Sequence, residues 1–174
     1  MHPGPDEKLV VLADYRDRYG LKTMVETGLY LGRGSGMSLN FPRYIVIDHQ
    51  QSNCDSAQAD GFDTRCGDSG DLLPGVLAEL DGPALIWLDA HGVDDDFPGF
   101  PDFPLFRELA AIAICAGPNS SDHVVLIDDI EMMKGGAESP LAGSSTLTEL
   151  RTVVDNYGLW DREETDEIMR LTPR

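Results

Sequence analysis

Residues 23–36 read Thr23-Met24-Val25-Glu26-Thr27-Gly28-Leu29-Tyr30-Leu31-Gly32-Arg33-Gly34-Ser35-Gly36, and this stretch decides the fold. The first five residues predict a short buried strand, and the four glycines predict a loop that leads into a short helix ending before Pro42. Backbone without a Cβ atom can approach a ligand closely, and ligands of open parallel sheets bind at the carboxyl ends of strands. The loop therefore predicts a ligand site, with a flexible turn as the alternative.

Short apolar runs alternate with helical patterns along the rest of the chain. Further strands are predicted over residues 44–48, 62–66, 84–89 and 124–128, and a terminal hairpin over 159–172. Helices are predicted over 6–19, from Asp68 or Ser69 onward, over 105–116 and over 146–157. The first helix is expected to present the apolar residues Leu9, Val10, Leu12 and Ala13. This alternation indicates an α/β domain with a mainly parallel sheet, spanning 1–174, in which 1–20 form an N-terminal helix before the sheet.

The composition limits the partners and the compartment of the protein. The 174 residues include 13 Lys and Arg but 31 Asp and Glu, a formal net charge of −18, so binding to nucleic acid or to a membrane surface is not expected. Apolar runs are far shorter than the roughly 20 residues of a membrane span, and no signal-peptide pattern is present, so a cytoplasmic protein is expected. The three cysteines lack a Cys-x-x-Cys pair and are expected to be reduced: Cys54, Cys66 and Cys115.

Polar residues follow the second and third predicted strands. Asp48 stands twenty positions after Gly28, where a nucleoside-binding α/β fold places an acid that accepts from ribose hydroxyls, although it could also be a solvated strand end. Residues 67–69, Gly-Asp-Ser, are placed to bind an adenine amino group, to cap the next helix, or to do both. Met37 occupies the place of the third glycine of the dinucleotide motif, which disfavours an NAD-dependent dehydrogenase.

Three acids follow the fourth and fifth predicted strands, namely Asp89, Asp128 and Asp129. Neighbouring strands lie about 4.8 Å apart, so these carboxylates could converge on one divalent cation. Alternatively, one of them caps a helix and another faces solvent. His91 could act as a general base, as a metal ligand or as a hydrogen-bonded loop residue, and His49 lies beside a strand end without a recognisable set of partners.

Taken in order, the motifs at 25–35, 48, 67–69, 88–89 and 127–129 resemble those of class I S-adenosylmethionine-dependent methyltransferases. Within that family, the acid triplet resembles the metal-dependent macrocin-type O-methyltransferases. The resemblance covers about residues 22–157. It implies a Rossmann-like three-layer sandwich with a seven-stranded sheet of order 3-2-1-4-5-7-6, in which strand 7 is antiparallel, in agreement with the hairpin expected in the tail.

The resemblance also implies roles for residues of this chain. The cofactor would be S-adenosyl-L-methionine, with Glu26 and Gly28 near its methionine part, Asp48 on its ribose, and Asp68 with Ser69 beside its adenine. The full set of expected cofactor contacts is Glu26, Thr27, Gly28, Tyr30, Gly32, Ser35, Asp48, His49, Asp68, Ser69 and Asp89. Mg²⁺ would be held by Asp89, Asp128 and Asp129, and the expected catalytic residues are His91 and Asp89.

The activity implied is methylation of a hydroxyl on a small molecule, such as a sugar or a natural product, with assistance from Mg²⁺. No long insertion that could form a lid is recognisable, which leaves a homo-oligomer, a carrier protein or an open site as ways to capture the acceptor. Two other functions stay open. Residues 89–91 with Asp94 are similar to the ligand motif of arginase-type metallohydrolases, except that two residues rather than one separate His91 from Asp94. A nucleoside-binding protein without catalytic activity is the other alternative.

Overall fold

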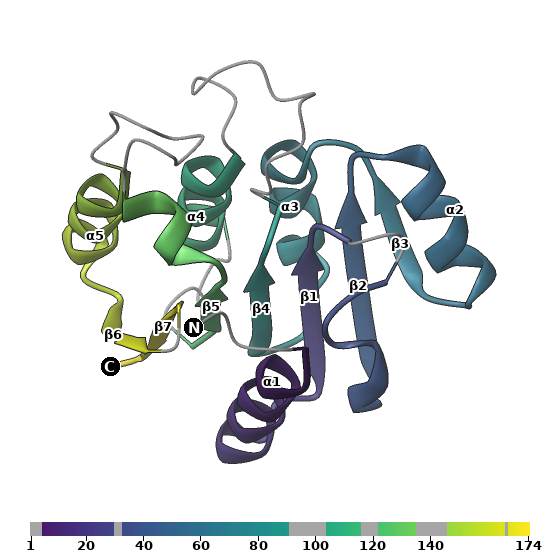
Figure 1. Cartoon of the computed structure of the whole chain (residues 1–174), viewed down its shortest axis with the longest axis horizontal. Helices are drawn as coiled ribbons and strands as arrows, with labels where there is room; N and C mark the ends of the chain where they lie inside the picture. The colour runs from purple at the N-terminus through teal and green to yellow at the C-terminus, as the bar shows by residue number, and fades with distance from the viewer. Residues whose placement is uncertain (1–4, 30–32, 91–103, 116–121, 135–145, 166) are drawn as a thin grey trace.

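The computed structural model describes residues 5–29, 33–90, 104–115, 122–134, 146–165 and 167–174. In these residues, seven strands form one sheet of order β3-β2-β1-β4-β5-β7-β6 (Figure 1). The strands are β1 Thr23–Thr27, β2 Arg43–Asp48, β3 Asp63–Cys66, β4 Ala84–Leu88, β5 Val124–Ile127, β6 Trp160–Thr165 and β7 Ile168–Pro173. Strands β1 to β5 are parallel, and β7 runs antiparallel to both β5 and β6. The predicted strand order and the terminal hairpin are confirmed.

Helices cover both faces of this sheet. They are α1 Pro5–Tyr19, α2 Gln51–Ala59, α3 Ser69–Ala78, α4 Pro104–Cys115 and α5 Thr146–Tyr157, with short 3₁₀ helices η1 Met37–Leu39 and η4 Ile130–Lys134. Side chains alternate between the faces of a strand. In β4, Leu85 and Trp87 therefore pack in the cluster that includes α1 and α2, whereas Ile86 and Leu88 pack in the cluster that includes α3, α4 and α5. This three-layer arrangement confirms the predicted fold class.

Helix α1 packs on the sheet through fewer residues than its sequence indicates. Leu12 and Tyr15 are buried, but Val10 is 69% exposed, so the expectation that Val10 belongs to the buried stripe is wrong. Only the positions on the sheet side of the helix are covered, and Val10 lies on the opposite side of the turn from that contact. Within the described part of the chain, no helix combines the length and the apolar character needed to cross a membrane.

The cysteines differ from the expectation. Cys54 of α2 and Cys66 at the end of β3 form a disulfide, with their Cα atoms 5.8 Å apart, so the prediction of three reduced cysteines is wrong for this pair. The turn between α2 and β3 brings the two cysteines together, because α2 packs beside β3. The separation of the two Cα atoms is in the range that a disulfide spans. Cys115 of α4 is free and exposed.

Charged side chains lie along both edge strands of the sheet. On β3, Arg65 pairs with Asp63 of the same strand and lies 3.2 Å from Glu79. On β6, Arg162 pairs with Asp155 of α5 at 3.0 Å. Both edge strands therefore carry charged residues that form local ion pairs.

Candidate functional site

The candidate site begins where the chain leaves β1. Gly28 has a φ of +85° and donates its backbone N–H to the carbonyl of Ile47, 2.9 Å away. A Cβ atom at this position would lie 2.4 Å from the backbone oxygen of Asp89. Since a side chain at residue 28 would meet both an unfavourable φ and the backbone after β4, the sequence requires glycine here.

Glu26 shapes the loop that follows. Its side chain is 1% exposed, and its carboxylate accepts from the backbone N–H of Ser35 at 2.5 Å, from that of Gly36 at 3.0 Å and from the hydroxyl of Tyr44. Burial raises the pKa of Glu26, and these donors oppose the rise. A Cβ atom on Gly34 would lie 2.2 Å from the Tyr44 hydroxyl oxygen. Glu26 thus anchors the glycine loop through hydrogen bonds to its backbone.

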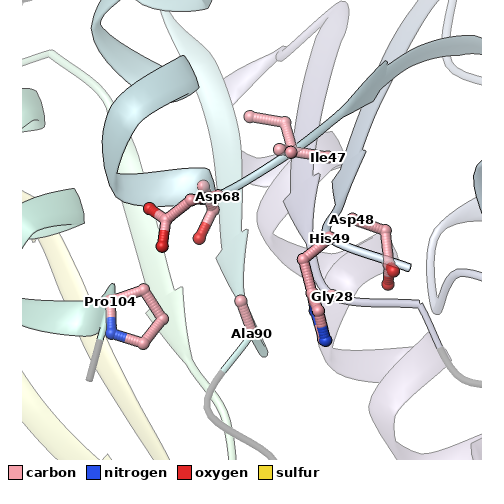
Figure 2. A pocket seen from close by; sticks show the side chains of 9 residues that line it. Gly28, Ile47, Asp48, His49, Asp68, Ala90 and Pro104 are labelled. Atoms are coloured by element: carbon pink, nitrogen blue, oxygen red, sulfur yellow. The ribbon is translucent and has the colours of Figure 1, made fainter. Parts of the chain in front are cut away.

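Asp48 joins the end of β2 to the loops around it. One carboxylate oxygen accepts from the backbone N–H of Leu29 at 2.7 Å. The other accepts from the backbone N–H of Gln50 at 2.7 Å and from the Asn53 amide at 3.3 Å. The residue is 5% exposed, and in Figure 2 its carboxylate points away from Asp68. Asp48 therefore fixes the loops after β1 and β2 directly.

A small pocket, partly open to solvent, lies at the carboxyl ends of β1 to β4. It is lined by Gly28, Ile47, Asp48, His49, Gly67, Asp68, Ser69, Ala90 and Pro104. Figure 2 shows Asp68 and Pro104 on one side of the hollow and His49 with Gly28 on the other. Asp68 also caps α3, because its side chain accepts from the backbone N–H of Asp71 at 3.2 Å. The pocket and the cap share this residue, as the sequence allowed.

The three acids after β4 and β5 lie together. In the parallel register, Thr27 pairs with Leu88, which pairs with Ile127, so the residues that follow these strands emerge side by side. Carboxylate oxygens of Asp89, Asp128 and Asp129 lie within 4.8 Å of one another. Burial, followed by the charge of Asp128, raises the pKa of Asp89 to about 8. The expected convergence of the acids is therefore present in the geometry.

A lysine also reaches this acid triplet, which no sequence pattern predicted. Lys8, in the first turns of α1, pairs with Asp128 and lies 3.5 Å from a carboxylate oxygen of Asp129. Burial acts to lower the pKa of Lys8, but the hydrogen bond to Asp128 and the nearby carboxylates raise it above its usual value. The ammonium is therefore charged at neutral pH and neutralises part of the triplet.

Comparisons with known proteins find solved structures of the same architecture. No family model matches the chain, and no curated protein matches it in sequence. An O-methyltransferase from Bacillus cereus in complex with SAH is 15% identical, with a TM-score of 0.60 over 98% of this chain and 82% of that one. TomG, an O-methyltransferase of Streptomyces achromogenes involved in tomaymycin synthesis, in complex with SAM, is 15% identical, with a TM-score of 0.58 over 100% of this chain and 82% of that one. The SAH-bound methyltransferase PaMTH1 of Podospora anserina is 13% identical, with a TM-score of 0.58 over 96% and 78%.

The chain has the fold of the S-adenosylmethionine-dependent methyltransferases. The family resemblance drawn from the sequence is confirmed at the level of this fold. Identities of 13–15% do not transfer a substrate or a metal requirement to this chain. In the methyltransferase fold, the described pocket lies beside β1, where the strand order reverses, which is the position at which open α/β sheets bind ligands.

The acid triplet offers the donor chemistry that Mg²⁺ requires. Carboxylate oxygens are the ligands that Mg²⁺ prefers, and three of them lie close enough to share one ion. Asp128 is fully buried, and its backbone N–H donates to the Leu88 carbonyl at 3.1 Å, which anchors the triplet to the end of β4. The donor set fits the ion.

The first turns of α4 contain two residues that sequence reasoning missed. Arg107 pairs with Asp68 at 2.7 Å and with Asp71 at 2.8 Å, and so ties α4 to the start of α3. Glu108 is 0% exposed, and within the described residues neither of its carboxylate oxygens makes a well-formed hydrogen bond. Burial raises the pKa of Glu108 to about 7, while the nearby Ser69 and Thr27 hydroxyls oppose the rise. The sequence feature that could have identified Glu108 is the presence of an acid on the apolar face of the helix predicted over 105–116.

Some of the predicted site residues lie outside the described part of the chain. These are Tyr30, Gly32, His91 and Asp94. The roles of Tyr30 and Gly32 at the cofactor and of His91 as a base remain predictions, as does the similarity of residues 89–94 to a metallohydrolase motif.

Proposed function

We propose that this protein is an S-adenosylmethionine-dependent methyltransferase that transfers a methyl group to a hydroxyl of a small molecule, such as a sugar or another natural product. One observation carries the proposal: the pocket at the strand ends, lined by Gly28, Asp48 and residues 67–69, lies in the methyltransferase fold beside the acid triplet. The catalytic unit would be the single domain over residues 1–174.

The cofactor side of the pocket would use the chain as follows. Residue 28 carries no side chain, because a Cβ atom there would meet the backbone of Asp89. The methionine part of the cofactor would bind beside this glycine. Asp48 would accept from one ribose hydroxyl, since a carboxylate has about four lone-pair sites and three are engaged by Leu29, Gln50 and Asn53. Asp68 and Ser69 would border the adenine, and His49 would cover it from the exposed side.

The acceptor side would lie at the acid triplet. Asp89, Asp128 and Asp129 would hold Mg²⁺, which supplies charge that lowers the pKa of a bound hydroxyl and orients it. Methyl transfer forms a carbon–oxygen bond as the carbon–sulfur bond of the sulfonium breaks, and the hydroxyl proton passes to a base. His91 and Asp89 are the proposed proton acceptors, and S-adenosylhomocysteine is the second product.

The test is isothermal titration of S-adenosylmethionine and S-adenosylhomocysteine into the full chain, with and without Mg²⁺, and with NAD as the control ligand. Micromolar binding of the first two and none of NAD supports the proposal. Asp48→Asn should weaken this binding at least tenfold, whereas the matched control Asp60→Asn, on an exposed turn, should not. Absence of binding under every condition contradicts the proposal and favours the metallohydrolase with Asp89, His91, Asp128 and Asp129.

The partners and the compartment remain proposals. A net charge of −18 favours a small-molecule acceptor over nucleic acid or a membrane surface, and a homo-oligomer is the proposed assembly. We keep the cytoplasm as the proposed localisation. The Cys54–Cys66 disulfide counts against a reducing compartment, because thiols there are normally kept reduced, so the redox state of this pair in cells tests the localisation.

A further inference from the structure

Lys8 contacts two of the three carboxylates that would hold a metal ion in the acid triplet. Its ammonium pairs with Asp128 and lies 3.5 Å from Asp129, and Asp89 adds to the negative charge around it. Lys8 is carried by α1, far from the triplet in sequence, and its side chain is 19% exposed. The cluster therefore already contains one positive charge, supplied by the N-terminal helix.

A divalent cation and this ammonium need the same oxygens. Mg²⁺ binds carboxylate oxygens at about 2.0–2.1 Å, and an ion held by Asp128 and Asp129 would place two further positive charges within a few ångström of the Lys8 nitrogen. Like charges at such a separation repel strongly in a partly buried site. The two cations therefore exclude each other from the triplet.

We propose that Lys8 competes with a divalent cation for Asp128 and Asp129, so that metal binding withdraws Lys8 and loosens the start of α1. This inference rests on the metal subsite of the proposed function, but not on methyl transfer itself. The rest of α1 stays attached, because Leu12 and Tyr15 are buried against the sheet independently of Lys8. Coupling of this kind is reciprocal, so docking of the first turns of α1 weakens metal binding as much as the metal weakens docking.

The experiment titrates Mn²⁺, as a probe for Mg²⁺, into the full chain without cofactor. Removal of the lysine charge in Lys8→Met should tighten Mn²⁺ binding at least about tenfold, the scale of one charge-assisted hydrogen bond. Lys8→Arg keeps the charge and should bind Mn²⁺ as the unmodified protein does. Lys22→Met removes an exposed lysine elsewhere and is the matched control, with no change expected.

A second measurement follows α1 directly. In the unmodified protein, hydrogen exchange of the peptide over residues 7–19 should quicken in its first turns when Mn²⁺ is added, and it should not respond to Mn²⁺ in Asp129→Asn. If Lys8→Met fails to fold, as judged by circular dichroism, this exchange result decides.

Four results overturn the competition. They are equal or weaker Mn²⁺ binding by folded Lys8→Met, tighter binding by Lys8→Arg as well, Mn²⁺ binding without any change in exchange over α1, and no Mn²⁺ binding by any of the proteins. Cofactor binding is measured separately. S-adenosylmethionine binding combined with any of these results leaves the methyltransferase proposal standing and removes only the role of Lys8.

Discussion

Glu108 should make the protein less stable as the pH rises. Its carboxyl is fully buried, and its pKa is about 7 in the folded protein against an ordinary value of 4.5. A folded-state pKa above the unfolded value means that the folded state binds the proton more tightly. The stability associated with the protonated group is therefore complete below about pH 4.5 and is lost as the pH rises towards 7.

The size of the effect follows from the two pKa values. Each pH unit corresponds to about 1.36 kcal/mol, so a rise from 4.5 to about 7 amounts to about 3 kcal/mol of unfolding free energy. Glu108→Gln resembles the protonated carboxyl in shape and does not ionise. We expect this variant to match the unmodified protein near pH 4.5 and to exceed its unfolding free energy by about 3 kcal/mol at pH 8.

Urea unfolding at pH 4.5, 6, 7 and 8, monitored by the fluorescence of the buried Trp87 and Trp160, measures this difference in unfolding free energy. Asp89 also has a raised pKa, but it is present in both proteins, so the comparison isolates Glu108. Asp60→Asn, which removes an exposed acid, should show no such dependence. A stability gap between Glu108→Gln and the unmodified protein that stays constant with pH would refute the reasoning.

Three further predictions concern the site and its support. Gly28→Ala should lower the free energy of unfolding by about 2 kcal/mol or more and weaken S-adenosylmethionine binding in a titration. Gly20→Ala, with a similar φ but no atom within 4 Å of its Cβ, should keep full binding, and equal losses of affinity in the two variants would contradict the close-contact argument. Cys66→Ser should lower the unfolding free energy by about 3 kcal/mol, since the disulfide closes a loop of 12 residues. Reductant should have no effect on the melting temperature of this variant, and an effect that persists would refute the disulfide as the source of the stability. Asp129→Asn should bind Mn²⁺ at least tenfold more weakly in a calorimetric titration but bind S-adenosylmethionine normally; unchanged Mn²⁺ affinity would remove Asp129 from the metal subsite.

Local patterns were sufficient to predict the α/β class and most of the strands, whereas the strand order was predicted only through the family resemblance. The apolar runs that form most of β2, β4 and β5 are buried on both faces, which is what a continuous run without alternation indicates. The convergence of Asp89 and Asp128 was also predictable, because each directly follows a strand, and neighbouring parallel strands end at the same edge.

Features that depend on tertiary contacts were not predictable. The disulfide requires α2 to pack beside β3, and two cysteines separated by 12 residues carry no motif for this pairing. Lys8 reaches the triplet only through the packing of α1 on the sheet, which no spacing within α1 encodes. Burial of Glu108 depends on how α4 packs against α3, since an acid on a helical face is ordinarily solvated.

The charged edge strands restrict how copies of this protein can self-associate. Unpaired strand edges are templates for intermolecular β-pairing and aggregation, and charged side chains on an edge oppose such pairing. With Asp63 and Arg65 on one edge and Arg162 on the other, growth of the sheet across two molecules is unfavourable at both ends. A dimer of this protein, if one forms, is expected to bury helical surface and to leave the two seven-stranded sheets separate.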